Sequence, residues 1–466
     1  MSKTSKQKSC LEMLDELTKN LLEKWYPLVI DKEYGGYFTN ITYDFKLMPS
    51  QEKMIVTQAR HMWTTAKAAR FLNSEKYYEY SLHGFKFMME KMWDDKYGGF
   101  YQIRSREGNL CEIEGWFDEK RTYGNAFAIY GLAALYDITK DKNILEAAIN
   151  AFDWLDKHAY DPQFKGYFQF LTREGIPFDK NSSYKTKATD AVECGYKDQN
   201  SSIHLLEAFT ELYHVWKDKK LHDRLLELLT LIRDVITTPK GYLQLFFERD
   251  WKPVSFRNAP EEIRKANYRL DHVSFGHDYE TAFLMLEASY ALGLENDVET
   301  LRTAKKMLDH AIENGWDKKN GGFFDEGYYF TENGKCQIIK DTKNWWAQAE
   351  ALNVLLLFSK IFPNEKKYYK LFLKEWEYIK KYLIDHKYGD WYWGSLEKEP
   401  HYRTEPKGTI WKATYHNGRA LMNCITILSD DDCELYISNE KFRSIKYEFD
   451  DFIKHWQNVA DLVSVE

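Results

Sequence analysis

"DDKYGGFY", at residues 94–101, is a short turn built from acidic residues, a glycine pair that tolerates positive φ, and closing aromatic residues. Related turns recur along the chain: DKEYGGYF at 31–38, DPQFKGYF at 161–168, TPKGYLQ at 238–244, DKKNGGFF at 317–324 and DHKYGDWY at 385–392. The residue before the closing aromatic side chain is number 36, 99, 166, 241, 322 or 390, so successive copies lie 63 to 81 residues apart. Six copies at variable spacing predict one repeated supersecondary unit.

An amphipathic helical pattern precedes each turn. In 143–159 the apolar residues recur at helical spacing on one face, and similar patterns occur at about 9–26, 76–93, 219–236, 297–314 and 366–384. The segments that follow the turns are apolar around their whole circumference, as in 124–138, 281–293 and 349–362. Helices of that second kind are buried. The repeat is therefore an outer helix, a short aromatic turn of β-hairpin form, and an inner helix.

Six such units predict an all-α fold, the double-layered (α/α)6 barrel with short β-hairpin turns, in which inner helices surround a central cavity. An open α-solenoid is the structural alternative, but its typical period of about 33 to 47 residues is shorter than the one found here. We expect residues 1–466 to form a single catalytic domain. A further helical segment is expected at about 430–466.

The overall charge narrows the choice of partners. The 65 basic and 72 acidic residues give a net charge of −7, which offers no electrostatic reason to bind nucleic acid or an anionic membrane. No apolar run approaches the ~18 residues of a membrane span. The six cysteines are scattered, and the first residues lack the apolar core of a signal peptide. We expect a cytoplasmic monomer or homodimer with a small-molecule partner.

The starts of the inner helices carry polar and aromatic residues that a purely structural helix does not need. They read QARHMW (58–63), RTYGNAF (121–127), QNSSIH (199–204), FGHDYE (275–280), WWAQAE (345–350) and YHNGR (415–419). In a closed barrel these starts lie at one end of one cavity, and the helix N-termini favour an anionic species there. The residues expected to converge are Arg60, Tyr123, Asn200, His204, His277, Glu280, Trp346 and His416.

Three histidines at a comparable place in three repeats favour chemistry over packing. A metal site is an alternative, but no H-E-x-x-H pattern is present, and the spacing of His277 and Glu280 equally suits a carboxylate that orients a histidine. We therefore predict no metal. Patterns such as G-x-S-x-G, the P-loop and G-x-G-x-x-G are absent from the sequence, which gives no indication of acyl transfer, nucleotide hydrolysis or a nicotinamide cofactor.

Four segments carry a resemblance to a known family: QARHMW, SFGHDYE (274–280), KNWWAQAEA (343–351) and WKATYHNGR (411–419). They resemble the N-acylglucosamine 2-epimerase superfamily, and specifically its cellobiose 2-epimerase branch, over about residues 20 to 425. The resemblance implies an (α/α)6 barrel that inverts C2 of a reducing-end sugar without a cofactor. The substrate implied is a reducing disaccharide such as cellobiose, lactose or mannobiose.

The resemblance also implies roles for individual residues. His277 and His416 correspond to the two acid/base residues on opposite faces of the opened sugar, His204 to the group that assists ring opening, and Arg60 to the group that holds the enediolate. The implied sugar-binding residues are Tyr123, Asn200, Glu280, Trp346 and Trp411, with Trp345 as a further candidate.

The reaction independently requires this kind of set. Epimerisation removes a C2 proton from one face and returns one to the other, so it needs two groups that can each act as base or acid near neutral pH. Histidine, with a reference pKa of about 6.5, meets that need. The enediolate gathers negative charge on two oxygens, which an arginine fork stabilises.

Two positions depart from the branch. It usually reads Asn-Thr-His-x-His at the third inner helix, where this chain has Ser202 at the first histidine position and keeps His204. It usually has proline before the Tyr-His pair, where this chain has Thr414. The segment 172–198 is long and polar, and we expect it to cap the cavity near a second sugar unit.

Three alternatives stay open at this stage. The first is a monosaccharide 2-epimerase or an aldose–ketose isomerase, since both reactions share the enediolate. The second is a glycoside hydrolase, which needs two carboxylates across the scissile bond, and for which Glu280 and Glu350 are the candidates. The third is a sugar-binding protein that has lost turnover.

Overall fold

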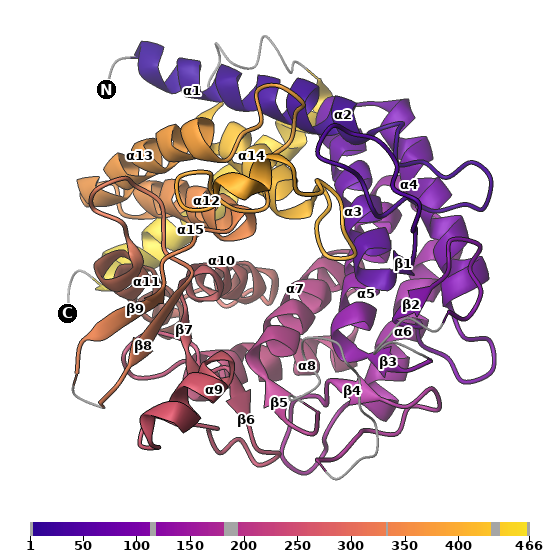
Figure 1. Ribbon diagram of the computed structural model, residues 1–466, viewed down its shortest axis with the longest axis horizontal. Coiled ribbons are helices and arrows are strands. Elements are labelled where there is room, and N and C mark those ends of the chain that lie inside the picture. The colour runs from indigo at the N-terminus through magenta and orange to yellow at the C-terminus, as the bar shows by residue number, and fades with distance from the viewer. Residues whose placement is uncertain (1–2, 112–117, 181–193, 332–333, 430–438, 464–466) are drawn as a thin grey trace.

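Two concentric rings of helices build the protein (Figure 1), seen in a computed structural model that describes residues 3–111, 118–180, 194–331, 334–429 and 439–463. The inner ring consists of α3 (Ile55–Leu72), α5 (Thr122–Thr139), α7 (Gln199–Val215), α10 (Phe275–Ala291), α12 (Trp345–Ile361) and α14 (Tyr415–Leu428). Each inner helix contacts the next one along the chain, and α14 contacts α3. The ring is therefore closed, and the predicted (α/α)6 barrel is confirmed.

The outer ring matches the predicted amphipathic segments. Its members are α1 (Lys3–Asp15) with the π-helical η1 (Glu16–Leu22) and α2 (Glu23–Trp25), α4 (Glu75–Phe87) with π-helical η2 (Met88–Met92), α6 (Lys142–His158), α8 (Lys219–Leu231) with π-helical η4 (Ile232–Ile236), α11 (Val298–Gly315) and α13 (Lys366–Tyr382). Helix α6 buries Ile144, Phe152 and Leu155 and exposes Glu146 on its other side.

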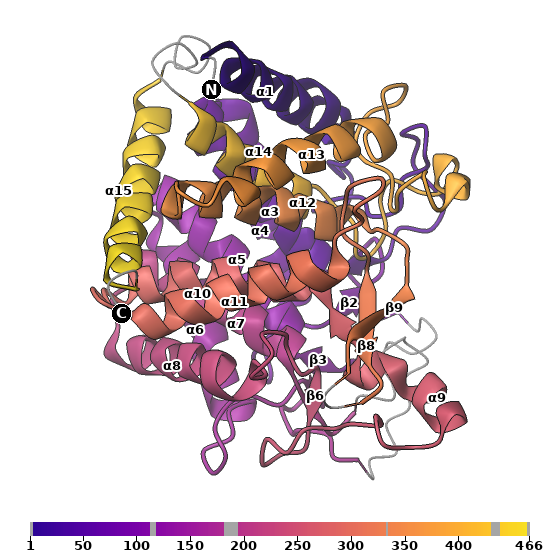
Figure 2. The same cartoon turned by 90° about the vertical axis from the view of Figure 1, so that its left-hand side faces the viewer.

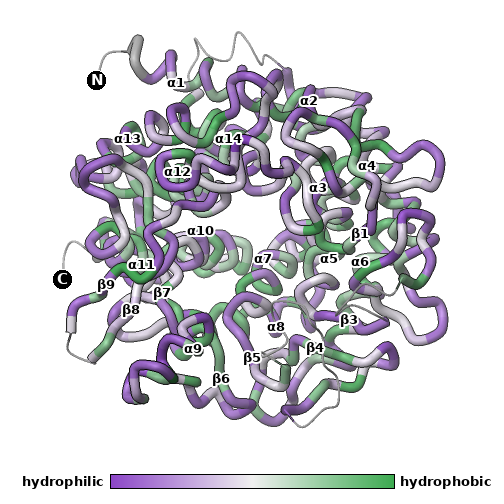
Figure 3. Tube along the Cα trace, viewed as in Figure 1, coloured by the Kyte–Doolittle hydropathy of each residue, from purple (hydrophilic) through white to green (hydrophobic). Residues whose placement is uncertain are grey.

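Burial distinguishes the two rings, as the hydropathy patterns predict. Helix α5 is buried at every residue from Thr122 to Leu135, whereas α6 alternates buried and exposed residues. Figure 3 shows hydrophobic residues along inner helices such as α7 and α10 and mostly hydrophilic residues in the outermost loops. The packing of one ring inside the other buries the apolar surface that stabilises the barrel.

Every predicted turn is closed by one antiparallel β-bridge, which confirms the short hairpins. The bridged pairs are Ile30 with Tyr37, Trp93 with Phe100, Tyr160 with Tyr167, Thr237 with Leu243, Trp316 with Phe323, and Ile384 with Trp391. Gly99 has φ of 75°, and a Cβ at this residue would lie 2.7 Å from the ring of Trp154. Glycine is therefore required there for both backbone conformation and space.

Buried lysines that sequence reasoning did not identify tie the turns to the inner helices. Lys120 Nζ lies 2.9 Å from Asp94 Oδ2, and Asp94 Oδ1 also accepts the backbone N–H of Lys96 at 3.0 Å. The same pairing recurs as Lys53 with Asp31, Lys197 with Asp161, and Lys343 with Asp317. This pairing explains the acidic residue that opens most of the turns.

Short antiparallel strands lead into several inner helices. The pairs are β1 (Lys53–Met54) with β2 (Ile103–Arg104), β3 (Lys120–Arg121) with β4 (Phe170–Leu171), β5 (Lys197–Asp198) with β6 (Phe246–Phe247), and the three-stranded β7 (Val273–Ser274), β8 (Glu326–Tyr329) and β9 (Cys336–Lys340). Two further helical segments are α9 (Glu261–Asp271) and the 3-10 turn η5 (Pro400–Arg403). Residues 181–193 of the expected cap lie outside the described residues.

The expected C-terminal helix is present as α15 (Glu440–Val463), while residues 430–438 and 464–466 lie outside the described residues. Helix α15 contacts α3, α11, α12 and α14, and it buries Phe442 and Trp456 completely. Figure 2 shows it at the end of the barrel away from strands β8 and β9. None of the helices in the described parts of the chain has the length and apolar character that crossing a bilayer requires.

Candidate active site

A continuous set of contacts joins the predicted residues at the N-terminal ends of the inner helices. The Trp346 ring centroid lies 4.7 Å from that of His277 and 5.7 Å from that of His416. On the other side, the ring of Tyr123 lies 5.0 Å from that of His204. The Tyr123 hydroxyl accepts a hydrogen bond from Arg60, and the guanidinium of Arg60 lies over the ring of Tyr415, which contacts the His416 ring. The barrel therefore brings the three histidines and the arginine into one site.

His277 stands in a neutral environment on α10. Its Nδ1 lies 2.8 Å from Ser274 Oγ, one helical turn earlier. Burial lowers the pKa of His277 to about 3, so the imidazole is neutral at physiological pH. Gly276 leaves room for Trp346 to pack against this end of α10, because a Cβ at Gly276 would lie 2.6 Å from the tryptophan ring. His277 is thus a neutral base held between a hydroxyl and an aromatic face.

His416 stands in a charged environment on α14. Its Nδ1 lies 2.7 Å from Glu350 Oε1, and Arg419 Nη2 lies 2.7 Å from the same oxygen. Since Oε1 already accepts from the guanidinium, the imidazole Nδ1–H is the donor, which leaves Nε2 for proton transfer. Burial, followed by the charges of Arg60 and Arg419, lowers the pKa of His416 well below its usual value. A carboxylate is nevertheless in place to stabilise the imidazolium when it forms.

His204 is oriented by a carboxylate of its own helix. Its Nδ1 lies 2.8 Å from Glu207 Oε2, and the other oxygen of Glu207 contacts Tyr415 and Arg419. Burial alone would raise the pKa of Glu207, but Arg419 and His204 outweigh it and lower the pKa to about 2. Glu207 is therefore ionised and fixes the orientation of His204.

Arg419 is the centre of this network, and sequence reasoning did not assign it a role. Its guanidinium contacts Glu207, Glu280 at 2.8 Å and Glu350 at 2.7 Å. Burial raises the pKa of both Glu280 and Glu350 to about 7. Part of this network could have been found from the sequence, because His204 and Glu207, and likewise Ser274 and His277, are three residues apart on one helical face. The contacts of Arg419 and Glu350 join residues far apart in sequence, so helical spacing cannot reveal them.

The donor set of Glu280, Glu350 and His416 has the chemistry of a cation site, with one ligand atom of each lying within 4.8 Å of the others. Arg419 Nη2 contacts the Oε1 atoms of both glutamates, so a guanidinium already balances much of their charge. The absence of a metal from the reaction stays a prediction.

Arg60 is placed to bind an anion. Its Nη1 donates to the Trp411 carbonyl at 2.6 Å and its Nη2 to the Tyr123 hydroxyl at 3.1 Å. The guanidinium also lies over the rings of Phe127 and Tyr415. These acceptors are uncharged, so the positive charge of Arg60 stays available to a ligand.

The remaining predicted residues differ in their accessibility to a ligand. Asn200 lies one helical turn before His204, and its buried Oδ1 has no hydrogen-bond partner among the described residues. The ring of Trp411 lies 6.4 Å from that of Tyr123, at the edge of the site. Trp345, by contrast, is 4% exposed and packs on Trp393 with 4.4 Å between centroids. The contact of Trp345 with a sugar stays a prediction.

Ser202 and Thr414, the two residues that depart from the branch pattern, both make hydrogen-bond contacts inside the barrel. Ser202 Oγ donates to the backbone carbonyl of Asp198. The equivalent position three residues after the helix start is Gln58 in α3 and Gln348 in α12, whose amides bind turn backbone. Position 202 thus belongs to the face turned away from the histidines. Thr414 Oγ1 lies 3.1 Å from the Tyr26 hydroxyl.

The sequence model of the N-acylglucosamine 2-epimerase (GlcNAc 2-epimerase) family matches residues 36–420. The chain belongs to this family. Among its relatives, the cellobiose 2-epimerase of Bacteroides fragilis is 30% identical over 420 residues, which cover 90% of this chain and 98% of the relative. A D-mannose isomerase of Marinomonas mediterranea is 25% identical over 413 residues, or 87% of this chain and 94% of the relative.

Solved structures agree with the family assignment. The structure of cellobiose 2-epimerase from Bacillus thermoamylovorans superposes with a TM-score of 0.76 at 26% identity, covering 90% of this chain and 99% of that one. As a member of the N-acylglucosamine 2-epimerase family, the chain is an isomerase of the sugar 2-epimerase type. The recognition made from the four sequence segments is confirmed.

Proposed function

We propose that this protein inverts C2 of the reducing-end glucose unit of a β-1,4-linked disaccharide, converting cellobiose to glucosyl-mannose and acting on related sugars such as lactose or mannobiose. The observation that carries the proposal is the pair His277 and His416, whose rings both lie within 6 Å of the Trp346 ring. A sugar chain stacked against that ring would meet one imidazole on each side. The cellobiose 2-epimerases among the relatives support the disaccharide.

Ring opening comes first in the proposed sequence. His204, oriented by Glu207, takes the proton from the O1 hydroxyl and returns it to the ring oxygen as the C1–O5 bond breaks. The product is the open-chain aldehyde, whose carbonyl makes the C2 proton acidic. Asn200 and Tyr123 hold the sugar hydroxyls at this end of the site. No net proton is gained or lost in this step.

Epimerisation follows at C2. One histidine removes the C2 proton, and the electrons of the C–H bond form the C1–C2 double bond of an enediolate. Arg60 stabilises the negative charge on O1 and O2. The other histidine, protonated from solvent, delivers a proton to the opposite face of C2 and restores the aldehyde with inverted configuration, while the first histidine gives its proton back to solvent. Each acid/base group contributes about 10²- to 10⁴-fold to the rate.

An aldose–ketose isomerase is the second candidate, because a D-mannose isomerase is also among the relatives. The same enediolate yields a ketose when the proton returns to C1 instead of C2. Glycoside hydrolysis is less favourable, because Glu280 and Glu350 both contact Arg419 Nη2 rather than flank a bond between two sugars.

Proton NMR of cellobiose in D2O with the purified protein tests the proposal, run beside mannobiose, mannose and N-acetylglucosamine. We expect glucosyl-mannose that carries deuterium at C2. A ketose product would favour the isomerase, and free glucose would favour the hydrolase. If the folded protein exchanged no C2 hydrogen in any of these sugars, the proposed function would be wrong.

A further inference from the structure

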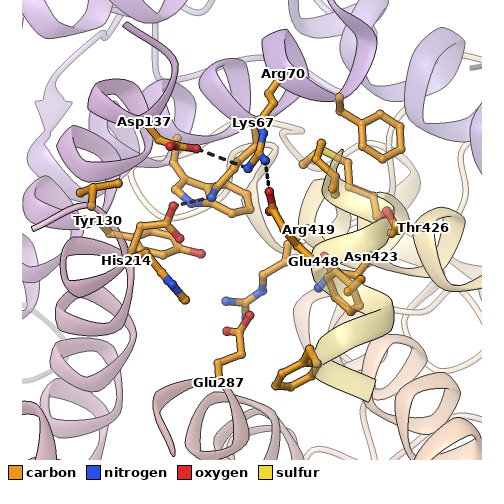
Figure 4. Close-up of a pocket in the computed structure, with 18 of the residues that line it drawn as sticks. Lys67, Arg70, Tyr130, Asp137, His214, Glu287, Arg419, Asn423, Thr426 and Glu448 are labelled. Carbon is orange, nitrogen blue, oxygen red and sulfur yellow. Dashed lines mark hydrogen bonds and ion pairs between the residues drawn. The ribbon is translucent and has the colours of Figure 1, made fainter. Parts of the chain in front are cut away.

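A second cavity lies at the other end of the barrel, among the C-terminal halves of the inner helices (Figure 4). Its volume is about 390 Å³, within the ~300–1,000 Å³ range of small-molecule sites. Helix α15 forms one wall through Ile445, Glu448, Phe449 and Phe452. These residues lie beyond the segment matched by the family, 36–420. This end of the lumen therefore has a wall that the family pattern does not describe.

The charged groups of this cavity are largely paired with one another. Lys67 forms an ion pair with Glu211. Arg70 bridges Asp137 and Glu448, as the dashed lines in Figure 4 show. Arg419 reaches the cavity from the active-site side, where its charge is balanced by three glutamates. A charged ligand would lose its hydration in this cavity, and these basic residues would offer it no free positive charge in return. Binding of a charged ligand is therefore unfavourable.

The remaining polar groups of the cavity are neutral. Trp63 is 4% exposed, and its indole Nε1 has no hydrogen-bond partner among the described residues. Burial lowers the pKa of His214, which is therefore an uncharged imidazole. Burial raises the pKa of Glu287 to about 8, so this group is largely a carboxylic acid at neutral pH. Figure 4 shows the Glu287 side chain pointing toward Arg419.

Aromatic surface accompanies these groups. The rings of Trp63 and Tyr130 stack with 5.1 Å between centroids and an interplanar angle of 12°. Phe449 and Phe452 face them from α15 as parts of the same lining. Neutral hydrogen-bonding groups beside aromatic rings match a molecule with many hydroxyls and apolar C–H faces.

We propose that this cavity binds a neutral, polyhydroxylated small molecule of monosaccharide size, at a site separate from the active site. The Glu287 carboxyl and the His214 imidazole bind its hydroxyl groups, and the aromatic rings contact its C–H surface. Arg419 lies between the two sites. It lines this cavity and also contacts Glu207 and Glu350, the glutamates that bind His204 and His416.

Calorimetric titration with methyl α-glucoside and with myo-inositol tests the site. Neither probe has a reducing end, so neither can undergo the proposed reaction. The decisive variant is Ile445→Trp, which fills the cavity from α15, and the matched control is Tyr447→Trp, two residues away and 69% exposed. Trp346→Ala removes an aromatic wall of the active site instead.

We expect a binding event in the millimolar range that persists in Trp346→Ala and Tyr447→Trp and is lost in Ile445→Trp. The proposal is overturned if neither probe binds the wild-type protein, if Ile445→Trp binds like the control, or if Trp346→Ala abolishes all binding. Because binding is measured without turnover, failure here leaves the proposed epimerase reaction standing.

A second pair of variants covers the case in which Ile445→Trp does not fold, as judged by circular dichroism. Glu287→Leu removes the hydrogen-bonding carboxyl and should weaken binding about tenfold, whereas Glu287→Gln keeps neutral hydrogen bonding and should bind nearly as the wild type does. Equal affinities of the two Glu287 variants would contradict the assignment.

Discussion

The two walls of the active site carry the same side chain in opposite settings. On α10, His277 is bound to the uncharged hydroxyl of Ser274. On α14, His416 is bound to Glu350, which Arg419 holds in place. A hydroxyl leaves an imidazole neutral, whereas a carboxylate stabilises the imidazolium. The comparison suggests that the protonated imidazole receives carboxylate support on one face of the sugar, at His416, and only a hydroxyl contact on the other, at His277.

Removal of either histidine should have the largest effect. We expect His277→Ala and His416→Ala each to lower kcat by about 10²- to 10⁴-fold, because each removes a general acid/base group. Circular dichroism and the melting temperature should stay near those of the wild type, since a polar cavity residue contributes little packing energy. A wild-type rate in either variant would show that the histidine it lacks is not needed for turnover.

Removal of the two orienting partners should show how the walls differ. Glu350→Gln takes away a hydrogen bond to a charged group, worth about 1.5–3 kcal/mol, so kcat should fall roughly 10- to 150-fold. Ser274→Ala removes a neutral hydrogen bond worth about 0.5–1.5 kcal/mol, so the loss should be about tenfold or less. Equal losses in kcat would mean that the two settings are functionally alike.

The pH profile should separate the same two walls. Burial raises the pKa of Glu350 and Glu280 to about 7, so both lose stabilising negative charge below that pH. We expect kcat/KM to rise with pH through about 7, and Glu350→Gln to flatten that rise while Ser274→Ala retains it. The pKa of His277, about 3, predicts no loss of its basic form above about pH 4. A rise that persisted in Glu350→Gln would assign it to another group.

A substitution outside both walls provides the control with the smallest effect on turnover. Asp94→Asn leaves the buried Lys120 without its carboxylate, which should cost about 3–5 kcal/mol of stability and leave kcat of the folded enzyme nearly unchanged. Asp94 has a pKa below its usual value, so its stabilisation is present above about pH 4 and is lost as the pH falls below that. Chemical denaturation at two pH values measures both. A large fall in kcat would link the turns directly to catalysis.

The barrel could be predicted from sequence because its determinants are local and repeated. Each turn begins with an aspartate or a threonine and contains a glycine. The hydropathy pattern of each helix indicates how deeply that helix is buried. Contacts such as Lys120 with Asp94 are regular in space, but they are 26 residues apart and gave no periodic signal.

The site was predictable only in part, because only some of its contacts are local in sequence. Side chains at helix starts, such as His277 and Arg60, are placed by the barrel as a whole, so knowing the fold sufficed. The pair of His204 and Glu207 is local, but Glu350 orients His416 across 66 residues. Arg419 reaches Glu350 and Glu207 across 69 and 212 residues, so only the folded barrel shows these contacts. The second cavity depends on α15, whose position against α3 and α14 no sequence pattern indicated.

The most direct test of the two-wall account is C2-hydrogen exchange in D2O, measured by NMR from each epimer separately with the two histidine variants. If each histidine serves one face, each variant should exchange the C2 hydrogen of one epimer without converting it to the other, and the two variants should act on different epimers. If both variants exchanged the same epimer, or if one of them still produced the second epimer at the wild-type rate, His277 and His416 would not serve opposite faces of the sugar.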